Sequence, residues 1–183
     1  MIYPIVLYGH PVLRKKAIDI DPDSFEPEPL ISDMFETMYR ANGVGLAAPQ
    51  IGKSLRLYVI DANPMGEEFP ELKGFKRVFI NPEILEHSKE QIAFEEGCLS
   101  IPGIHEEVKR FEMVRMRYLD ENLDEKTETF SGFQAIVIQH EYDHLNGVLF
   151  TDKAAPLRKR LLRSKLAAIT KGKVETDYKI LKL

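Results

Sequence analysis

The chain has 183 residues, of which 44% are hydrophobic and 30% charged, and its net charge is −4. This length and composition predict one globular domain over residues 1–183. No run of eighteen apolar residues exists, so we expect no membrane-spanning helix. The N-terminus lacks a basic leader and a small-residue cleavage site, so we expect no signal peptide. A single cysteine, Cys98, excludes an internal disulfide, and together these features predict a cytoplasmic protein.

The charge is unevenly distributed along the chain. From Lys153 to the end, ten Lys and Arg face two acids, a balance of +8, so the other 152 residues carry −12. A basic C-terminal region over about residues 153–183 is typical of contact with an anionic partner, such as the RNA of the ribosome. A helix with a solvated basic face gives the same pattern, and both interpretations stay open.

The first half of the chain predicts one helix and two strands. The acid- and proline-rich stretch 19–29 indicates a surface loop. Apolar residues at helical spacing then predict a helix from about Ile31 to Arg40, which the following glycines end. β-Branched and aromatic residues predict strands over Leu55–Asp61 and Val78–Asn81.

More strands are predicted after residue 90. Glu90–Glu95 forms one candidate. Val108–Tyr118 and Lys126–Phe130 predict a hairpin or meander, with residues 120–124 as its turn.

The strongest helix signal starts at Ser131. Ser131 and Gln134 match a capping-box pattern, and Asn146-Gly147 ends the helix. A last helix is predicted over Pro156–Ile169. The elements together predict an α+β fold, in which a mostly antiparallel β-sheet packs around a central helix and a C-terminal helix follows.

The central helix carries the sequence His140-Glu-Tyr-Asp-His144. Residues four apart lie one turn apart on a helix, so both imidazoles can reach one metal ion. The same face carries Phe133, Ile136 and Val137, and two histidines on an apolar face need polar partners. A bound metal supplies them.

A catalytic metal normally takes three protein ligands and keeps one position open. No histidine follows His144, and the later acids Asp152, Glu175 and Asp177 are unattractive ligands. Upstream, Cys98 stands in Glu96-Gly-Cys-Leu-Ser100, at the end of the strand predicted there. A free cysteine is most often a small buried apolar residue, but the missing downstream ligand favours a thiolate ligand.

A glycine-rich segment, Gly43-Val-Gly-Leu-Ala-Ala-Pro-Gln50, follows the first helix. It has neither the third glycine nor the lysine of a nucleotide-binding loop. Flexible backbone followed by small residues suits a site that a substrate backbone approaches closely; a simple helix-ending turn is the alternative.

These three segments, Gly43–Gln50, Glu96–Ser100 and Gln139–His144, resemble the three motifs of the bacterial-type peptide deformylases, in the same order. The span that they bracket covers more than half of the chain. The resemblance implies an α+β hydrolase that removes the formyl group from the N-terminal formyl-methionine of newly made polypeptides. It also implies one divalent metal ion per chain, held by Cys98, His140 and His144. Because the family is associated with iron, the resemblance implies Fe²⁺ in the cell, and Zn²⁺, Ni²⁺ or Co²⁺ can occupy such a site.

The resemblance also implies the roles of other residues. Glu141 would accept a proton from the metal-bound water and return it to the leaving amine. The Gln50 side chain and the Leu99 backbone N–H would stabilise the charge on the formyl oxygen. Substrate contacts are expected from the motif segments and from the helix face that carries the histidines: Gly43, Val44, Gly45, Glu96, Gly97, Phe133, Ile136 and Val137. The apolar members of this set would hold the methionine side chain, although ordinary core positions look the same in sequence.

Two positions depart from the family's usual pattern. His105 stands where many bacterial members carry an arginine, and Asn42 replaces an acid found in some members. Asp143 is expected either to support a ligand or to pair with an arginine such as Arg110.

Two other functions compete with this interpretation. A small zinc protease of the His-Glu-x-x-His type would need a third ligand downstream of the helix. An RNA-binding module with a structural metal would need four protein ligands, and the sequence offers only three good candidates.

Overall fold

The computed structural model describes residues 1–181. In chain order its helices are α1 (Pro27–Arg40), α2 (Gly132–Leu145) and α3 (Pro156–Thr170). Its strands are β1 (Ile5–Val6), β2 (Gly45–Ala47), β3 (Leu57–Asp61), β4 (Lys76–His87), β5 (Gln91–Cys98), β6 (Ile101–Phe111), β7 (Met113–Leu119), β8 (Glu125–Ser131) and β9 (Ile180–Leu181). Short 3₁₀ turns join several of them: η1 (Pro11–Arg14), η2 (Ala48–Ile51), η3 (Asn63–Met65), η4 (Pro70–Leu72) and η5 (Phe150–Lys153).

The main sheet has five antiparallel strands in the order β2-β3-β4-β7-β8. Side chains alternate between the two faces of a strand. In β3, Tyr58 and Ile60 therefore pack in the cluster that contains residues of α2, whereas Leu57 and Val59 pack with residues of α1. Helices cover both faces of this strand, and this double burial explains why its sequence is an unbroken apolar run.

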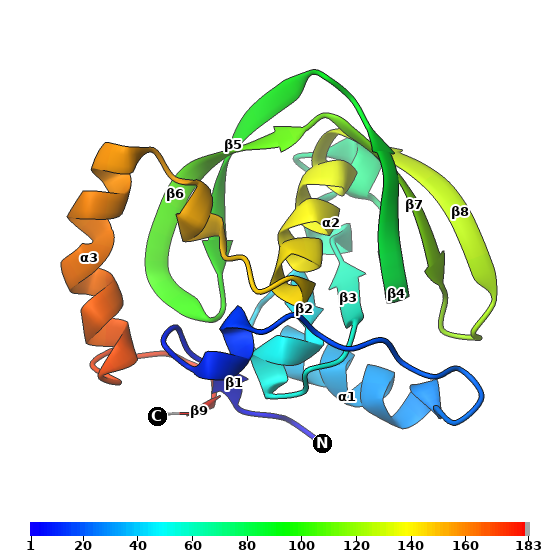
Figure 1. Cartoon of the computed structure of the whole chain (residues 1–183), viewed down its shortest axis with the longest axis horizontal. Helices are drawn as coiled ribbons and strands as arrows, with labels where there is room; N and C mark the ends of the chain where they lie inside the picture. The colour runs from blue at the N-terminus through cyan, green and yellow to red at the C-terminus, as the bar shows by residue number, and fades with distance from the viewer. Residues whose placement is uncertain (182–183) are drawn as a thin grey trace.

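Helix α2 lies at the centre of the molecule, between the main sheet and the β5–β6 hairpin (Figure 1). It is buried on several sides rather than along one stripe. The predicted α+β fold, with a mostly antiparallel sheet around a central helix, is confirmed.

The start of α2 differs from the prediction. Ser131 makes no capping hydrogen bond, because it is the last residue of β8 and its backbone is extended. Gln134 instead donates its side-chain amide to the Glu71 carbonyl, at 2.7 Å. Gly132 turns the chain from strand to helix with a φ of +58°, which glycine adopts without strain. The capping-box prediction was wrong.

The predicted strand Val108–Tyr118 is two strands in the structure. Residues up to Phe111 belong to β6, which pairs with β5, and residues from Met113 belong to β7, which pairs with β4 and β8. The side chain of Gln139 in α2 bonds both the N–H and the C=O of Phe111, at 3.0 and 2.8 Å. The chain thus changes sheets where it crosses the central helix. The predicted turn over 120–124 does join β7 and β8.

Helix α1 begins at Pro27, inside the stretch that we predicted to be a loop. Pro27 and Pro29 occupy the first turn, where the missing N–H groups would have no helical acceptor in any case. The prolines in this stretch therefore belong to the start of a helix, and only the residues before Pro27 form the predicted loop.

Two features complete the C-terminal part. Helix α3 matches its predicted range within one residue and packs against the outside of β6 (Figure 1). Strand β9, which we did not predict, pairs in parallel with β1 near the N-terminus. The last two residues of the predicted basic tail lie outside the described part. Across residues 1–181, none of the helices has the length and apolar character needed to cross a bilayer.

Phe79 offers a test of this core. Its side chain is fully buried, and its ring centroid lies 4.7 Å from that of Tyr58 and 4.5 Å from that of Tyr118. We expect Phe79→Ala to lower the free energy of unfolding by about 3–5 kcal/mol, measured by urea denaturation, because the cavity left behind cannot close fully. The partly exposed Leu85 serves as control, and Leu85→Ala should cost about 0.5 kcal/mol or less. Equal losses in the two variants would contradict this packing.

Candidate metal centre

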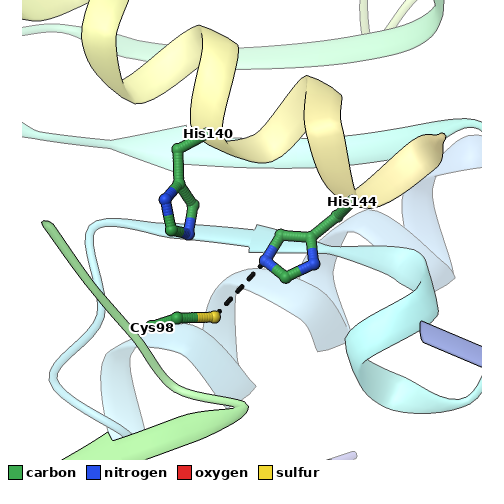
Figure 2. Close-up of side chains that lie close together, drawn as sticks. All are labelled: Cys98, His140 and His144. Carbon is green, nitrogen blue, oxygen red and sulfur yellow. Dashed lines mark hydrogen bonds between the residues drawn. The ribbon is translucent and has the colours of Figure 1, made fainter. Parts of the chain in front are cut away.

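The three predicted ligands come together in space. Cys98 ends β5, and His140 and His144 project from one side of α2 toward it (Figure 2). Their candidate ligand atoms all lie within 4.8 Å of one another. The Cys98 sulfur is 3.4 Å from Nε2 of His144.

This donor set fits a divalent metal ion. One thiolate and two imidazoles suit zinc, ferrous iron and related ions, and three ligands leave a coordination position open. His140 directs its Nδ1 to Glu96 at 2.7 Å, which leaves Nε2 available for a metal. The buried Nδ1 of His144 has no hydrogen-bond partner among residues 1–181.

The two histidines differ in proton affinity. Burial alone would lower the pKa of His140, but hydrogen bonds to Cys98 and Glu96 raise it well above its ordinary value. Burial and the neighbouring His140 hold the pKa of His144 well below its ordinary value. A metal cation bound between these side chains would take the place of the proton that His140 otherwise favours.

A buried ionic network supports His140. Arg110 in β6 donates two hydrogen bonds to Glu96, both 2.8 Å long, and a third to Asp143 at 2.5 Å. The expected pairing of Asp143 with Arg110 is confirmed. Both oxygens of Glu96 are engaged, by Arg110 and His140, and only 5% of the residue is exposed. Glu96 also lines the cavity described below, so the substrate contact expected of it stays a prediction.

Glu141 lies in the same site but outside this network. It is buried, and its Oε2 makes no hydrogen bond to any residue that the structure describes. Burial raises the pKa of Glu141 to about 7. Gly45 lies directly against it, since a Cβ there would come within 2.8 Å of the Glu141 carboxyl carbon. A carboxyl group with a pKa near neutrality can both accept and return a proton.

The site opens into a cavity of about 540 Å³. The Gln50 amide reaches its wall with fixed orientation, because its oxygen accepts from the Ala47 N–H at 2.9 Å and its nitrogen lies 3.2 Å from the Ser100 hydroxyl oxygen. Apart from Phe133 and His144, all residues predicted for the site line the cavity: Gly43, Val44, Gly45, Gln50, Glu96, Gly97, Cys98, Leu99, Ile136, Val137, His140 and Glu141.

Phe133 is absent from the cavity wall. Its ring packs instead against Phe69, with centroids 3.6 Å apart, and against Phe94, at 4.8 Å. Phe94 and Met65 do line the cavity, and neither is among the residues predicted for the site. Helical spacing identified a face of α2, but it could not tell which part of that face a neighbouring loop covers.

The C-terminal segment also reaches the cavity, which we did not predict. Glu175, Thr176, Asp177 and Tyr178 all line it. In this segment the acidic residues Glu175 and Asp177 are exposed and alternate with the half-buried Thr176 and Tyr178. Such an alternation in the sequence could have indicated that one side of the segment packs against the protein. Asp152, another downstream acid, pairs with Arg14 at 2.5 Å and so is engaged away from the three ligands.

Fold and site together define a mixed α+β protein with a candidate metal site, in which Cys98 and two helical histidines lie beside a buried carboxylate. Comparison with known proteins identifies the family. The family model for polypeptide deformylase matches residues 2–160. The chain therefore belongs to the polypeptide deformylase family, and it is a hydrolase of that type.

Individual relatives agree over nearly the whole chain. A peptide deformylase of Christiangramia forsetii is 53% identical and covers 98% of this chain and 95% of its own. The crystal structure of peptide deformylase from Thermus thermophilus has a TM-score of 0.81 at 43% identity, covering 92% of this chain and 98% of that one. A plant peptide deformylase structure has a TM-score of 0.83 at 37% identity, covering 93% and 90%.

The buried network gives a pH-dependent prediction. Burial alone would raise the pKa of Glu96, but bonds from Arg110 and His140 lower it to about 2, against an ordinary value of 4.5. Because the folded pKa is the lower one, Glu96 stabilises the fold above that ordinary value and loses this contribution as the pH falls toward 2. We expect Glu96→Gln to lower the free energy of unfolding by on the order of 3 kcal/mol at neutral pH, and this gap to narrow between about pH 5 and pH 3.

Urea denaturation of the metal-free proteins across this pH range would measure the gap. Glu95→Gln, a change at the exposed neighbouring residue, is the matched control and should stay within about 0.5 kcal/mol of the original protein. A gap that stays constant with pH would show that Glu96 does not hold its charge through this network.

Proposed function

We propose that this chain removes the formyl group from the N-terminal formyl-methionine of newly made polypeptides, using one divalent metal ion held by Cys98, His140 and His144. The observation that carries this proposal is the buried Glu141 carboxylate, free on one oxygen, beside three metal-binding side chains in the cavity of a deformylase-family chain. A closed structural metal site would leave no place for such a group.

When bound, the ion would act as a Lewis acid and would lower the pKa of a water molecule toward neutrality. Fe²⁺ is the ion that we propose for the cell, with Zn²⁺, Ni²⁺ or Co²⁺ able to replace it, because a thiolate with two imidazoles accepts each of them. Glu96 keeps the His140 ring in the orientation that this set requires.

Glu141 carries the proton in this proposal. It accepts a proton from the water that attacks the formyl carbon, and it returns a proton to the amine nitrogen as the C–N bond breaks. Its burial supports both steps, since the raised pKa lies close to the pH at which the enzyme would work. Gly45 allows the carboxylate to lie close to the wall that the substrate backbone passes.

Gln50 and Leu99 stabilise the charge that develops on the formyl oxygen. The bond from the Ala47 N–H to the Gln50 oxygen turns the Gln50 nitrogen toward Cys98, 3.4 Å from the sulfur. A donor that is already in position gains most when charge appears on the acceptor. The Leu99 backbone N–H is the second donor, on the residue directly after the cysteine ligand.

The limited room in the cavity explains the proposed selectivity for the formyl group. Gly43 and Gly45 lie close to other parts of the site. A Cβ on Gly43 would clash with Leu99, and a Cβ on Gly45 would clash with Glu141. Val44, Ile136 and Val137 supply the apolar wall for the methionine side chain. A formyl group carries only hydrogen on its carbonyl carbon and therefore fits in this space. A larger acyl group would clash with the surrounding residues.

We place this activity in the cytoplasm, in a single catalytic domain over residues 1–183. Ribosomal RNA is the partner that we propose for the basic C-terminal region. Exposed cations on α3 support it: Lys159, Arg160, Arg163 and Lys165.

Formate release tests the proposed function directly. With protein prepared anaerobically and loaded with Fe²⁺, we expect formyl-Met-Ala-Ser to yield formate and acetyl-Met-Ala-Ser to yield no acetate. Cys98→Ser is the control, and it should lose metal and activity together, because it lacks the thiolate ligand. No formate from a protein that binds one metal ion per chain would overturn the proposal.

Glu141→Gln separates proton transfer from metal binding. The amide keeps the size of the carboxylate but cannot accept the proton, so we expect kcat to fall by about 10²–10⁴ while the metal content stays unchanged. Formate assays and metal analysis on the same sample would measure both quantities. A normal turnover number in this variant would remove Glu141 from the proposed role.

A further inference from the structure

The chain returns to the catalytic cavity after α3. From the end of this helix the chain runs along the lower edge of the view to β9, which pairs with β1 (Figure 1). On the way, residues Glu175–Tyr178 line the cavity that holds Glu141 and Cys98. This segment lies beyond residue 160, where the match to the family model ends.

Contacts on both sides hold the segment in place. The Tyr178 hydroxyl donates to the Leu99 carbonyl at 2.7 Å, so the segment is tied to the residue after the cysteine ligand. Beyond it, Ile180 pairs with Ile5, and the Ile5 N–H donates to the Lys179 carbonyl at 2.8 Å. These bonds fix the segment as part of the cavity wall.

The mouth of the cavity is acidic. Glu95, Glu175 and Asp177 are exposed and line it. Among residues 1–181, no lysine or arginine lines the cavity, and its basic side chains are the imidazoles of His105 and His140. The cavity also contains the buried Glu141 carboxylate with a free oxygen, which marks it as a place that takes a ligand.

The position of the reacting groups sets the direction of a substrate. Glu141 is buried in the cavity wall beside Cys98, with the buried His144 next to Cys98, whereas Glu175 and Asp177 are exposed. In the proposed reaction the formyl group must reach the buried groups. An extended peptide advances about 3.3 Å per residue. The residues that follow methionine therefore leave toward the mouth, where Glu175 and Asp177 stand.

We infer that the segment Glu175–Tyr178 forms the wall for the substrate residues after methionine, and that Glu175 and Asp177 make the enzyme prefer basic residues there over acidic ones. This inference rests on the proposed deformylase function and adds to it a charge preference set by the C-terminal segment. The physical basis is the field of exposed carboxylates around a cleft, which attracts positive and repels negative groups.

The test compares kcat/KM for amidated formyl-Met peptides that carry Lys or Glu at the second or third position. We expect Lys to be preferred at one of these positions by about fivefold at low salt, the size expected for a few exposed charges. The preference should shrink at about 0.5 M salt, where screening acts within a few ångströms.

Two double variants locate the source of the preference. E175Q/D177N should lose most of it, whereas E121Q/E125Q, which removes the same charge from the distant β7–β8 turn, should keep it. The preference is a ratio measured on one preparation, so any loss of folded protein cancels.

Failure of the charge preference and failure of the deformylase function give different results. Formate release with equal kcat/KM for Lys and Glu peptides, or a full preference retained in E175Q/D177N, would overturn the inference and leave the deformylase function standing. No formate from any formyl peptide would overturn the proposed function itself.

Discussion

The Arg110 guanidinium joins three elements at the centre of the molecule. From β6 it binds Glu96 in β5 and Asp143 in α2, and only 3% of the residue is exposed. A buried charge of this kind is costly unless its partners are complete, and removing one partner typically costs about 3–5 kcal/mol. The two strands and the helix are thus held in one relative position. The candidate metal site depends on that position, because its three side chains come from both β5 and α2 and lie within 4.8 Å of one another.

This network also explains how a buried helix can carry so many polar side chains. Gln139 bonds the backbone of β6, His140 bonds Glu96, and Asp143 bonds Arg110. Each of these polar groups therefore has a partner, as burial requires. Glu141 differs from them, with one oxygen left free among the described residues. A buried carboxylate with an unbonded oxygen is costly for folding, and the same burial raises the pKa of Glu141. The same feature makes the group able to move a proton.

The grouping of the three candidate ligands could be predicted from sequence, because two of them are related by local helix geometry and the third is limited by count. His140 and His144 are one helical turn apart, and Cys98 is the only cysteine. The support that Glu96 gives to His140 could not be predicted, because nothing local to Glu96 shows that Arg110, fourteen residues away, binds both of its oxygens. The capping box failed for a similar reason, since Ser131 already belonged to β8. The place of the C-terminal segment could not be predicted from its charge, because only its return to β1 and the bond from Tyr178 to Leu99 bring it to the cavity.

Tolerance to change differs between the two ends of the cavity. At the inner end, each side chain serves both stability and chemistry, so a substitution there disturbs the buried network as well as the reaction. At the mouth, exposed side chains such as Glu175 and Asp177 make few contacts, and changes at such positions usually alter stability by about 0.5 kcal/mol or less. A change of charge at the mouth would therefore leave the buried network intact. The segment that carries these residues is attached by backbone pairing to β1 and by one hydroxyl to Leu99, contacts that do not depend on the identity of its acidic side chains. An anchored backbone with replaceable side chains is what a specificity wall requires.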